Sequence, residues 1–175
     1  MVPKPGKFAR RWRPSFGDNL EARFEVTTLG GAKGSEVRPI LLVNDSREDV
    51  DVFRSALRKM GYQNPFQAVN SGEEALQYLR GDGQYANRRK YPLPHLVLLD
   101  PNMPGITGWE VLEWLRARPE FDPVVAIMFG GTGSLEEIDQ AHRLGANGCQ
   151  GKPATTAESE ELVNRIGLHW FTDGK

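Results

Sequence analysis

The sequence feature that most constrains the fold is an apolar segment that stops abruptly at a lone carboxylate. Residues 95–108 read HLVLLDPNMPGITG, so the run from His95 to Leu99 leads directly into Asp100. Proline and glycine follow at once and end any strand there. A continuous apolar run closed by turn residues is typical of a buried strand in a parallel sheet. Because such sheets bind ligands at the carboxyl ends of their strands, Asp100 is the first candidate functional residue.

The composition limits the classes of partner. The 175 residues suggest one domain with room for an appendage, and 22 Lys and Arg against 23 Asp and Glu give a net charge of -1. This balance does not favour a general nucleic-acid binder. The single cysteine, Cys149, excludes an internal disulfide and favours a reducing, cytoplasmic compartment. No apolar run approaches the ~18 residues of a membrane span, so we expect no membrane partner. Because the charges are balanced, we expect no DNA partner either.

The first 37 residues differ from the rest of the chain. They hold seven basic and four acidic residues, a net charge of +3, and end in the glycine-rich stretch from Gly30 to Ser35. We therefore predict a basic extension and linker over residues 1–37 and the main domain over residues 38–175. Two interpretations of the extension stay open: a flexible tail, or a docking arm for a partner or a second subunit.

From Pro39 onward, short apolar runs alternate with amphipathic helical patterns. Strands are predicted at 40–43, 66–69, 95–100, 124–128 and 147–152, and helices at 46–60, 72–80, from 108 onward, 135–144 and 156–168. Four of the helix starts carry Ser or Thr followed three residues later by Glu, the pattern of a capping box. The start from Ser46 to Asp49 is the aspartate variant. Strict alternation predicts a parallel sheet with helices on both faces and right-handed crossovers.

A second carboxylate is expected beside Asp100. Asp45 ends the first predicted strand as Asp100 ends the third, and in a doubly wound sheet these two strand ends border the same crevice. Two carboxylates at one place suit Mg²⁺, which binds through one or two carboxylates, waters and a phosphate. Lys152, just past the fifth strand, could reach an anion beside the metal. This combination suits phosphoryl transfer with Asp100 as the nucleophile.

In the segments ILLVNDSREDV, LVLLDPNMPGITGWEVL and LGANGCQGKP, the chain resembles the receiver domain of two-component response regulators, over about residues 38–168. The resemblance implies a flavodoxin-like, doubly wound, five-stranded parallel sheet in the order 2-1-3-4-5. It implies a single-domain regulator, not an enzyme beyond Mg²⁺-dependent chemistry at Asp100, that accepts phosphate from a sensor histidine kinase. The long loop over residues 81–94 is similar to that of small regulators associated with bacterial phytochromes.

The same resemblance implies roles for individual residues. Mg²⁺ would be held by Asp45, Asp100 and the backbone carbonyl of Asn102, and Lys152 would pair with the phosphate. A cis Lys152–Pro153 peptide bond is a further expectation. The family also suggests a homodimer through the face made by the helix at 135–144, the strand at 147–152 and the helix at 156–168.

The chain departs from the family pattern at the site. Asn44 stands where the family usually has a second acid, Met128 where it has a hydroxyl, and Cys149 where it has an aromatic residue. Phe129 follows at a position that is usually small. Losing a carboxylate weakens Mg²⁺ binding, and methionine has no hydrogen to donate to a phosphoryl oxygen. The alternative function is therefore a degenerate receiver that acts as a phosphorylation-independent binding or scaffold module.

Overall fold

The computed structural model describes residues 39–170, in which five parallel strands form one sheet in the order β2-β1-β3-β4-β5. The order and the flavodoxin-like doubly wound arrangement agree with the prediction. The extension predicted over residues 1–37 lies outside the described residues. The strands are β1 (Ile40–Val43), β2 (Phe66–Val69), β3 (Leu96–Leu99), β4 (Val125–Phe129) and β5 (Gly148–Gln150).

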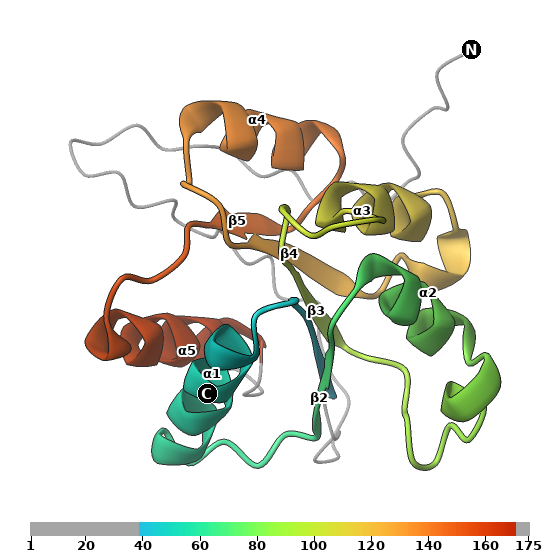
Figure 1. Cartoon of the computed structure of the whole chain (residues 1–175), viewed down its shortest axis with the longest axis horizontal. Helices are drawn as coiled ribbons and strands as arrows, with labels where there is room; N and C mark the ends of the chain where they lie inside the picture. Colours follow the sequence, from blue (N-terminus) through green and yellow to red (C-terminus); the bar gives the residue numbers. More distant parts are fainter. Residues whose placement is uncertain (1–38, 171–175) are drawn as a thin grey trace. The chain divides into compact units, whose positions relative to one another are not determined.

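Helices cover both faces of the sheet (Figure 1). Within the described residues they are α1 (Arg47–Lys59), α2 (Gly72–Arg80), α3 (Gly108–Arg116), α4 (Leu135–Arg143) and α5 (Thr156–Trp170), with short 3-10 turns at Gly83–Tyr85 and Pro119–Phe121. Helices α1 and α5 pack on one face, and α2, α3 and α4 pack on the other. Every predicted element is present, and most ends differ by one or two residues.

The two central strands are buried on both faces, as their uninterrupted apolar sequences predict. All four residues of β1 and all four of β3 are at most 1% exposed. Leu41 and Val43 join the core beneath α2, α3 and α4, whereas Ile40 and Leu42 join the core beneath α1 and α5. Each such side chain contributes about 1.5–3 kcal/mol by leaving water. This burial fixes the register of the strand ends that carry the candidate site.

A Ser or Thr side chain caps each predicted helix start, but the capping boxes predicted at Ser46, Ser71 and Thr155 are incomplete. At Ser71 and Thr155 the Glu three residues later accepts the N–H of the residue before the cap instead. Thr107 and Ser134 form complete capping boxes. At Ser46 only half of the box exists, because the Ser46 N–H donates to Asn44 Oδ1 at 2.8 Å instead of to Asp49. The prediction of an aspartate-type box was therefore wrong. The Asp49 carboxylate is left available for a partner at the candidate site.

The long loop over residues 81–94 has a partly aromatic interior. Tyr85 is only 3% exposed and packs on Tyr78 with ring centroids 5.0 Å apart. The Arg88 guanidinium donates to the carbonyls of Tyr78 and Leu79, at 2.7 and 2.6 Å. These carbonyls belong to the last turn of α2, where carbonyl groups have no N–H partner within the helix. Arg88 therefore caps α2 from the loop.

Gly108 allows α3 to begin directly against the end of β3. A Cβ atom at this position would lie 2.1 Å from the Asp100 carbonyl oxygen and 3.3 Å from Cα of Pro101. Both are backbone atoms, so they cannot move aside as a flexible side chain would. The close approach therefore requires glycine, and it fixes the backbone of Asp100.

We predict that Gly108→Ala lowers the free energy of unfolding by about 1–3 kcal/mol, because the added methyl group overpacks a backbone contact. Gly61→Ala separates this effect from backbone strain, since Gly61 has φ of +79° but a Cβ atom there would meet nothing within 4 Å. Urea unfolding monitored by circular dichroism measures both variants. A loss at Gly108 no larger than the loss at Gly61 would contradict the steric explanation.

Candidate functional site

Asp100 lies directly after β3, at the edge of the sheet where the carboxyl ends of the strands meet. Its backbone N–H donates to the Val43 carbonyl at 2.9 Å, which continues the β1–β3 pairing to the site. Its Oδ1 accepts the Asn102 N–H at 2.8 Å. A Cβ atom at Gly130 would lie 3.1 Å from the same oxygen. The carboxylate is thus oriented by backbone groups and partly enclosed.

The charges around Asp100 are predominantly negative. Burial raises the pKa of the Asp100 carboxyl, and the charges of Asp45 and Asp49 raise it further. The Asn102 N–H and the positive charge of Lys152 lower the pKa but do not offset the increase. Asp45, Asp49 and Lys152 therefore all act electrostatically on Asp100. The negative charges at the site outnumber the positive charge of Lys152 when Asp100 is ionised.

Asn44, at the acid position of the family pattern, is almost completely buried, with 3% of its surface exposed. Its backbone N–H donates to the Val69 carbonyl at 3.1 Å, and its Oδ1 accepts the Ser46 N–H. Its Nδ2 donates to Asp49 Oδ2 at 3.5 Å, a long contact. The amide therefore stabilises the turn from β1 into α1, and its donor group faces Asp49. Asp45, the next residue, is exposed.

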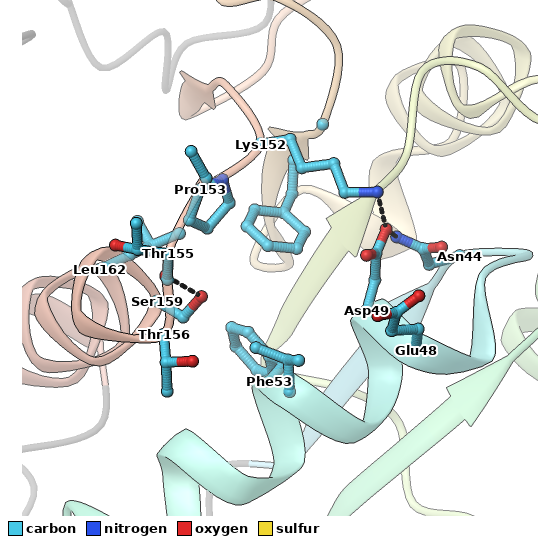
Figure 2. Close-up of a pocket in the computed structure, with 14 residues that line it drawn as sticks. Asn44, Glu48, Asp49, Phe53, Lys152, Pro153, Thr155, Thr156, Ser159 and Leu162 are labelled. Carbon is cyan, nitrogen blue, oxygen red and sulfur yellow. Dashed lines mark hydrogen bonds and ion pairs between the residues drawn. The ribbon is translucent and has the colours of Figure 1, made fainter.

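Lys152 contacts Asp49 rather than Asp100. The distance from Lys152 Nζ to Asp49 Oδ2 is 2.6 Å, and their side chains are 56% and 16% exposed (Figure 2). The hydrogen bond to Asp49 raises the pKa of Lys152, and the charge of Asp100 contributes in the same direction. Lysine and Asp100 are brought to one site as expected. The ion pair with Asp49 was not predicted.

Asp49 is the functional candidate that sequence reasoning missed. Its place three residues after Ser46 made it look like a capping acid only. Asp49 lies in the first turn of α1, which directly follows the end of β1, so its side chain can face the same crevice as the strand end. Its short distance in sequence from Asp45 was the signal that could have identified it.

Met128 and Cys149, which also depart from the family pattern, lie side by side in the sheet. Met128 is opposite Leu99 on one side and Cys149 on the other, and it is completely buried. Burial raises the pKa of the Cys149 thiol to about 11, with a smaller contribution from the charge of Glu137, so the thiol stays protonated at neutral pH. Met128 belongs to the core cluster beneath α2, α3 and α4, and Cys149 packs against it.

The residues around Met128 offer no substitute hydroxyl through the contacts described. The Thr132 hydroxyl donates to Glu137 Oε2 at 3.2 Å and thereby supports the start of α4. Phe129 points to the opposite face of the sheet and packs edge-on against Phe53, with ring centroids 5.6 Å apart. Large buried side chains therefore hold the end of β4 on both faces.

A cavity of ≈ 350 Å³ adjoins the site between α1, the end of β4 and the start of α5. Its apolar lining includes Phe53, Phe129 and Leu162. Figure 2 shows Lys152 extending along its upper side toward Asp49, with Thr155 and Ser159 opposite. The volume is in the range of small-ligand sites.

The donor set fits Mg²⁺ better than a metal that needs a complete protein cage. No group of three or more His, Cys, Asp or Glu residues within the described chain could by itself hold a metal ion. Mg²⁺ needs only one or two carboxylates, with waters and phosphate oxygens as its other ligands. Asp45 and Asp100 supply two carboxylates. The pKa of Asp100 is raised mainly by burial and further by the charges of Asp45 and Asp49, and a divalent cation would offset these charges.

The expected cis Lys152–Pro153 bond is wrong, because no cis peptide occurs in residues 39–170.

Comparison with known proteins identifies the family that this fold and site define. The response regulator receiver domain family matches residues 40–166, and the chain belongs to this family. Response regulator Rcp1 from Synechocystis sp. is 25% identical over 75% of this chain and 88% of its own length. Chemotaxis protein CheY-3 from Vibrio cholerae is 30% identical over 73% of this chain and 89% of its own length.

Solved structures agree with this assignment. The crystal structure of the phosphorylated cyanobacterial phytochrome response regulator RcpA is 27% identical, covers 80% of this chain and 98% of its own, and has a TM-score of 0.72. The Mn²⁺-bound form of response regulator Rcp1 is 24% identical, covers 78% and 96% of the two chains, and shares the fold with a TM-score of 0.70. No helix among the described residues is long and apolar enough to span a membrane.

We predict that Asp100→Asn raises the melting temperature at pH 7 in metal-free buffer. Because the folded-state pKa of Asp100 is above its usual value, ionisation of Asp100 favours the unfolded state, and the asparagine removes that effect. The amide oxygen can still accept the Asn102 N–H. The difference from the native protein should shrink as pH falls toward the ordinary range of an aspartate. Calorimetry between pH 4 and pH 8 measures it, and an equal or lower melting temperature at pH 7 would contradict the charge argument.

Proposed function

We propose that this chain is a single-domain response regulator that accepts a phosphoryl group on Asp100 from a sensor histidine kinase and signals by protein contact. The observation that carries this proposal is the position of Asp100 at the end of β3, where the charges of Asp45 and Lys152 both act on its carboxylate. A half-buried carboxylate with a nearby acid and a nearby ammonium suits phosphoryl transfer.

In the proposed reaction, an oxygen of Asp100 forms a bond to phosphorus while the bond from phosphorus to the kinase histidine nitrogen breaks. The histidine keeps the electron pair of the broken bond and takes a proton from water. Asp100 must be ionised to act as the nucleophile. The Asn102 N–H holds Oδ1 in place and so orients the carboxylate.

Asp45, Asp100 and the Asn102 carbonyl are the proposed ligands for Mg²⁺. When bound, the cation would neutralise negative charge on the carboxylates and the phosphoryl oxygens. We expect the affinity to be weak, because Asn44 replaces a second acid with a neutral amide. The Mn²⁺-bound form of Rcp1 supports divalent-metal binding by a protein of this fold.

The partner we propose is a phytochrome-type histidine kinase in the cytoplasm. Support comes from RcpA, which is a phytochrome response regulator. A homodimer through α4, β5 and α5 remains part of the proposal. Leu135, the first residue of α4, is an apolar residue that is 61% exposed, and this exposure supports a protein contact at α4. We propose no role in DNA binding.

A second candidate function, a phosphorylation-independent scaffold, is favoured by the completely buried Met128. Methionine at the strand end cannot donate a hydrogen bond to a phosphoryl oxygen. Without a differential contact, phosphorylation cannot shift the balance between two states of β4. This observation argues against the usual response and not against phosphoryl transfer itself.

We predict that incubation of the full-length chain with a small acyl phosphate and Mg²⁺ adds one phosphoryl group. Intact-mass spectrometry detects the product, and neither Asp100→Asn nor a magnesium-free sample should gain mass. Lys152→Ala should reduce the extent of phosphorylation, because it removes the cation that approaches the phosphoryl oxygens. Absence of any mass gain at high Mg²⁺ would favour the scaffold function.

We predict that Asn44→Asp tightens Mg²⁺ binding by about tenfold or less, since one added charge-assisted contact is worth roughly 1–1.5 kcal/mol. The new carboxylate would lie near Asp49, whose repulsion limits the gain. Isothermal titration calorimetry compares the variant with the native protein. Unchanged affinity would mean that residue 44 does not contribute to the metal site.

A further inference from the structure

We propose that Lys152 exchanges its ion pair with Asp49 for one with the phosphoryl group when Asp100 is phosphorylated. Asp49 is then a positioning residue that holds the lysine in its resting place, and the exchange reports phosphorylation to the start of α1. This inference rests on the proposed function. It adds Asp49 to the site. It also gives the chain a route of response to phosphorylation that does not use the positions of Asn44, Met128 and Cys149, where the chain departs from the family pattern.

The geometry of the ion pair points to competition for one cation. Lys152 Nζ lies 2.6 Å from Asp49 Oδ2, and no contact shorter than 4 Å joins it to the Asp100 carboxylate in the described residues. Yet both acids act on the pKa of Lys152, so both are near its ammonium. A lysine side chain has a long flexible stem, so its ammonium can move between neighbouring anions without moving the backbone.

The exposure of the pair makes the exchange favourable. More than half of the Lys152 side chain is in contact with solvent, so its pairing with a single carboxylate is weak. A phosphoryl group carries nearly two negative charges and three acceptor oxygens, which makes it the stronger partner. Phosphorylation of Asp100 would thus draw the ammonium away from Asp49.

Asn44 is suited to hold Asp49 after the lysine leaves. Its Nδ2 faces Asp49 Oδ2 at 3.5 Å and can shorten this contact once the ammonium has gone. An aspartate at the same position would repel Asp49 instead. The buried amide, which weakens the metal site, therefore also makes a carboxylate in the first turn of α1 tolerable without its cation.

The cavity gives the exchange a structural consequence. Lys152 and Asp49 both line it and connect the segment before α5 to α1. Met128, on one side of β4, is completely buried, and Phe129, on the other side, packs against Phe53 and borders the cavity. Breaking the ion pair removes a link between α1 and the segment before α5, next to a space of ≈ 350 Å³. The response is therefore expected at α1 and α5.

The test uses the full-length chain, saturating Mg²⁺ and fluoroberyllate, a tetrahedral analogue of the phosphoryl group, with binding measured by ¹⁹F NMR. Asp49→Asn should increase the affinity for fluoroberyllate roughly two- to fivefold, the factor expected for loss of a competing exposed ion pair. Asp49→Glu should restore the competition. Asp51→Asn is the matched control, because Asp51 lies on the same helix but pairs with Arg54 at 3.1 Å.

A second readout follows the backbone amides of residues 46–50 by ¹⁵N NMR. Fluoroberyllate should shift these signals in the native protein and in Asp51→Asn but much less in Asp49→Asn, which has no pair to break. Unchanged or weaker fluoroberyllate binding in Asp49→Asn would overturn the exchange, and weaker binding would identify Asp49 as a metal ligand instead. If the native protein takes up neither fluoroberyllate nor phosphate, the proposed function fails and the exchange fails with it.

Discussion

The hydrogen bond from the Asp100 N–H to the Val43 carbonyl is the contact on which the site depends. It extends the β1–β3 pairing by one residue beyond the end of β3 and thereby fixes Asp100 next to the turn that contains Asn44 and Asp45. Two strands buried on both faces cannot slip without exposing their apolar residues. The hydrophobic core therefore determines the separation of charged groups that are themselves outside it.

The site also shows how one neutral substitution changes the use of its neighbours. With Asn44 in place of an acid, the nearest anion for Lys152 is provided by α1 rather than by the strand ends. The lysine gains a partner, and Asp100 retains an unfavourable charge environment. Loss of a family residue thus does not simply remove an interaction, because the remaining charges pair differently.

The apolar runs and cap residues predicted the five strands and all five described helices, because burial and capping depend on residues close in sequence. The strand order came from the resemblance to receiver domains. The predicted strand ends also indicated that Asp100 and Lys152 share a site. They did not predict the Lys152–Asp49 pair, which depends on the direction of a side chain from the first turn of α1. The incomplete cap at Ser46 was missed because the side chain of Asn44, two residues earlier, accepts the Ser46 N–H. The aromatic interior of the 81–94 loop was missed because it depends on packing against Tyr78 of α2.

The tightly packed end of β4 has a consequence for the time course of signalling. A strand that must be displaced responds on the slow scale of collective motions, whereas an exposed side chain changes rotamer in picoseconds to nanoseconds. Met128 and Phe129 pack β4 on both faces, whereas the Lys152 side chain is 56% exposed, so the proposed ion-pair exchange uses the faster process. The conformation of the protein would then follow the phosphoryl group without delay, and the duration of a signal would be the chemical lifetime of the acyl phosphate alone.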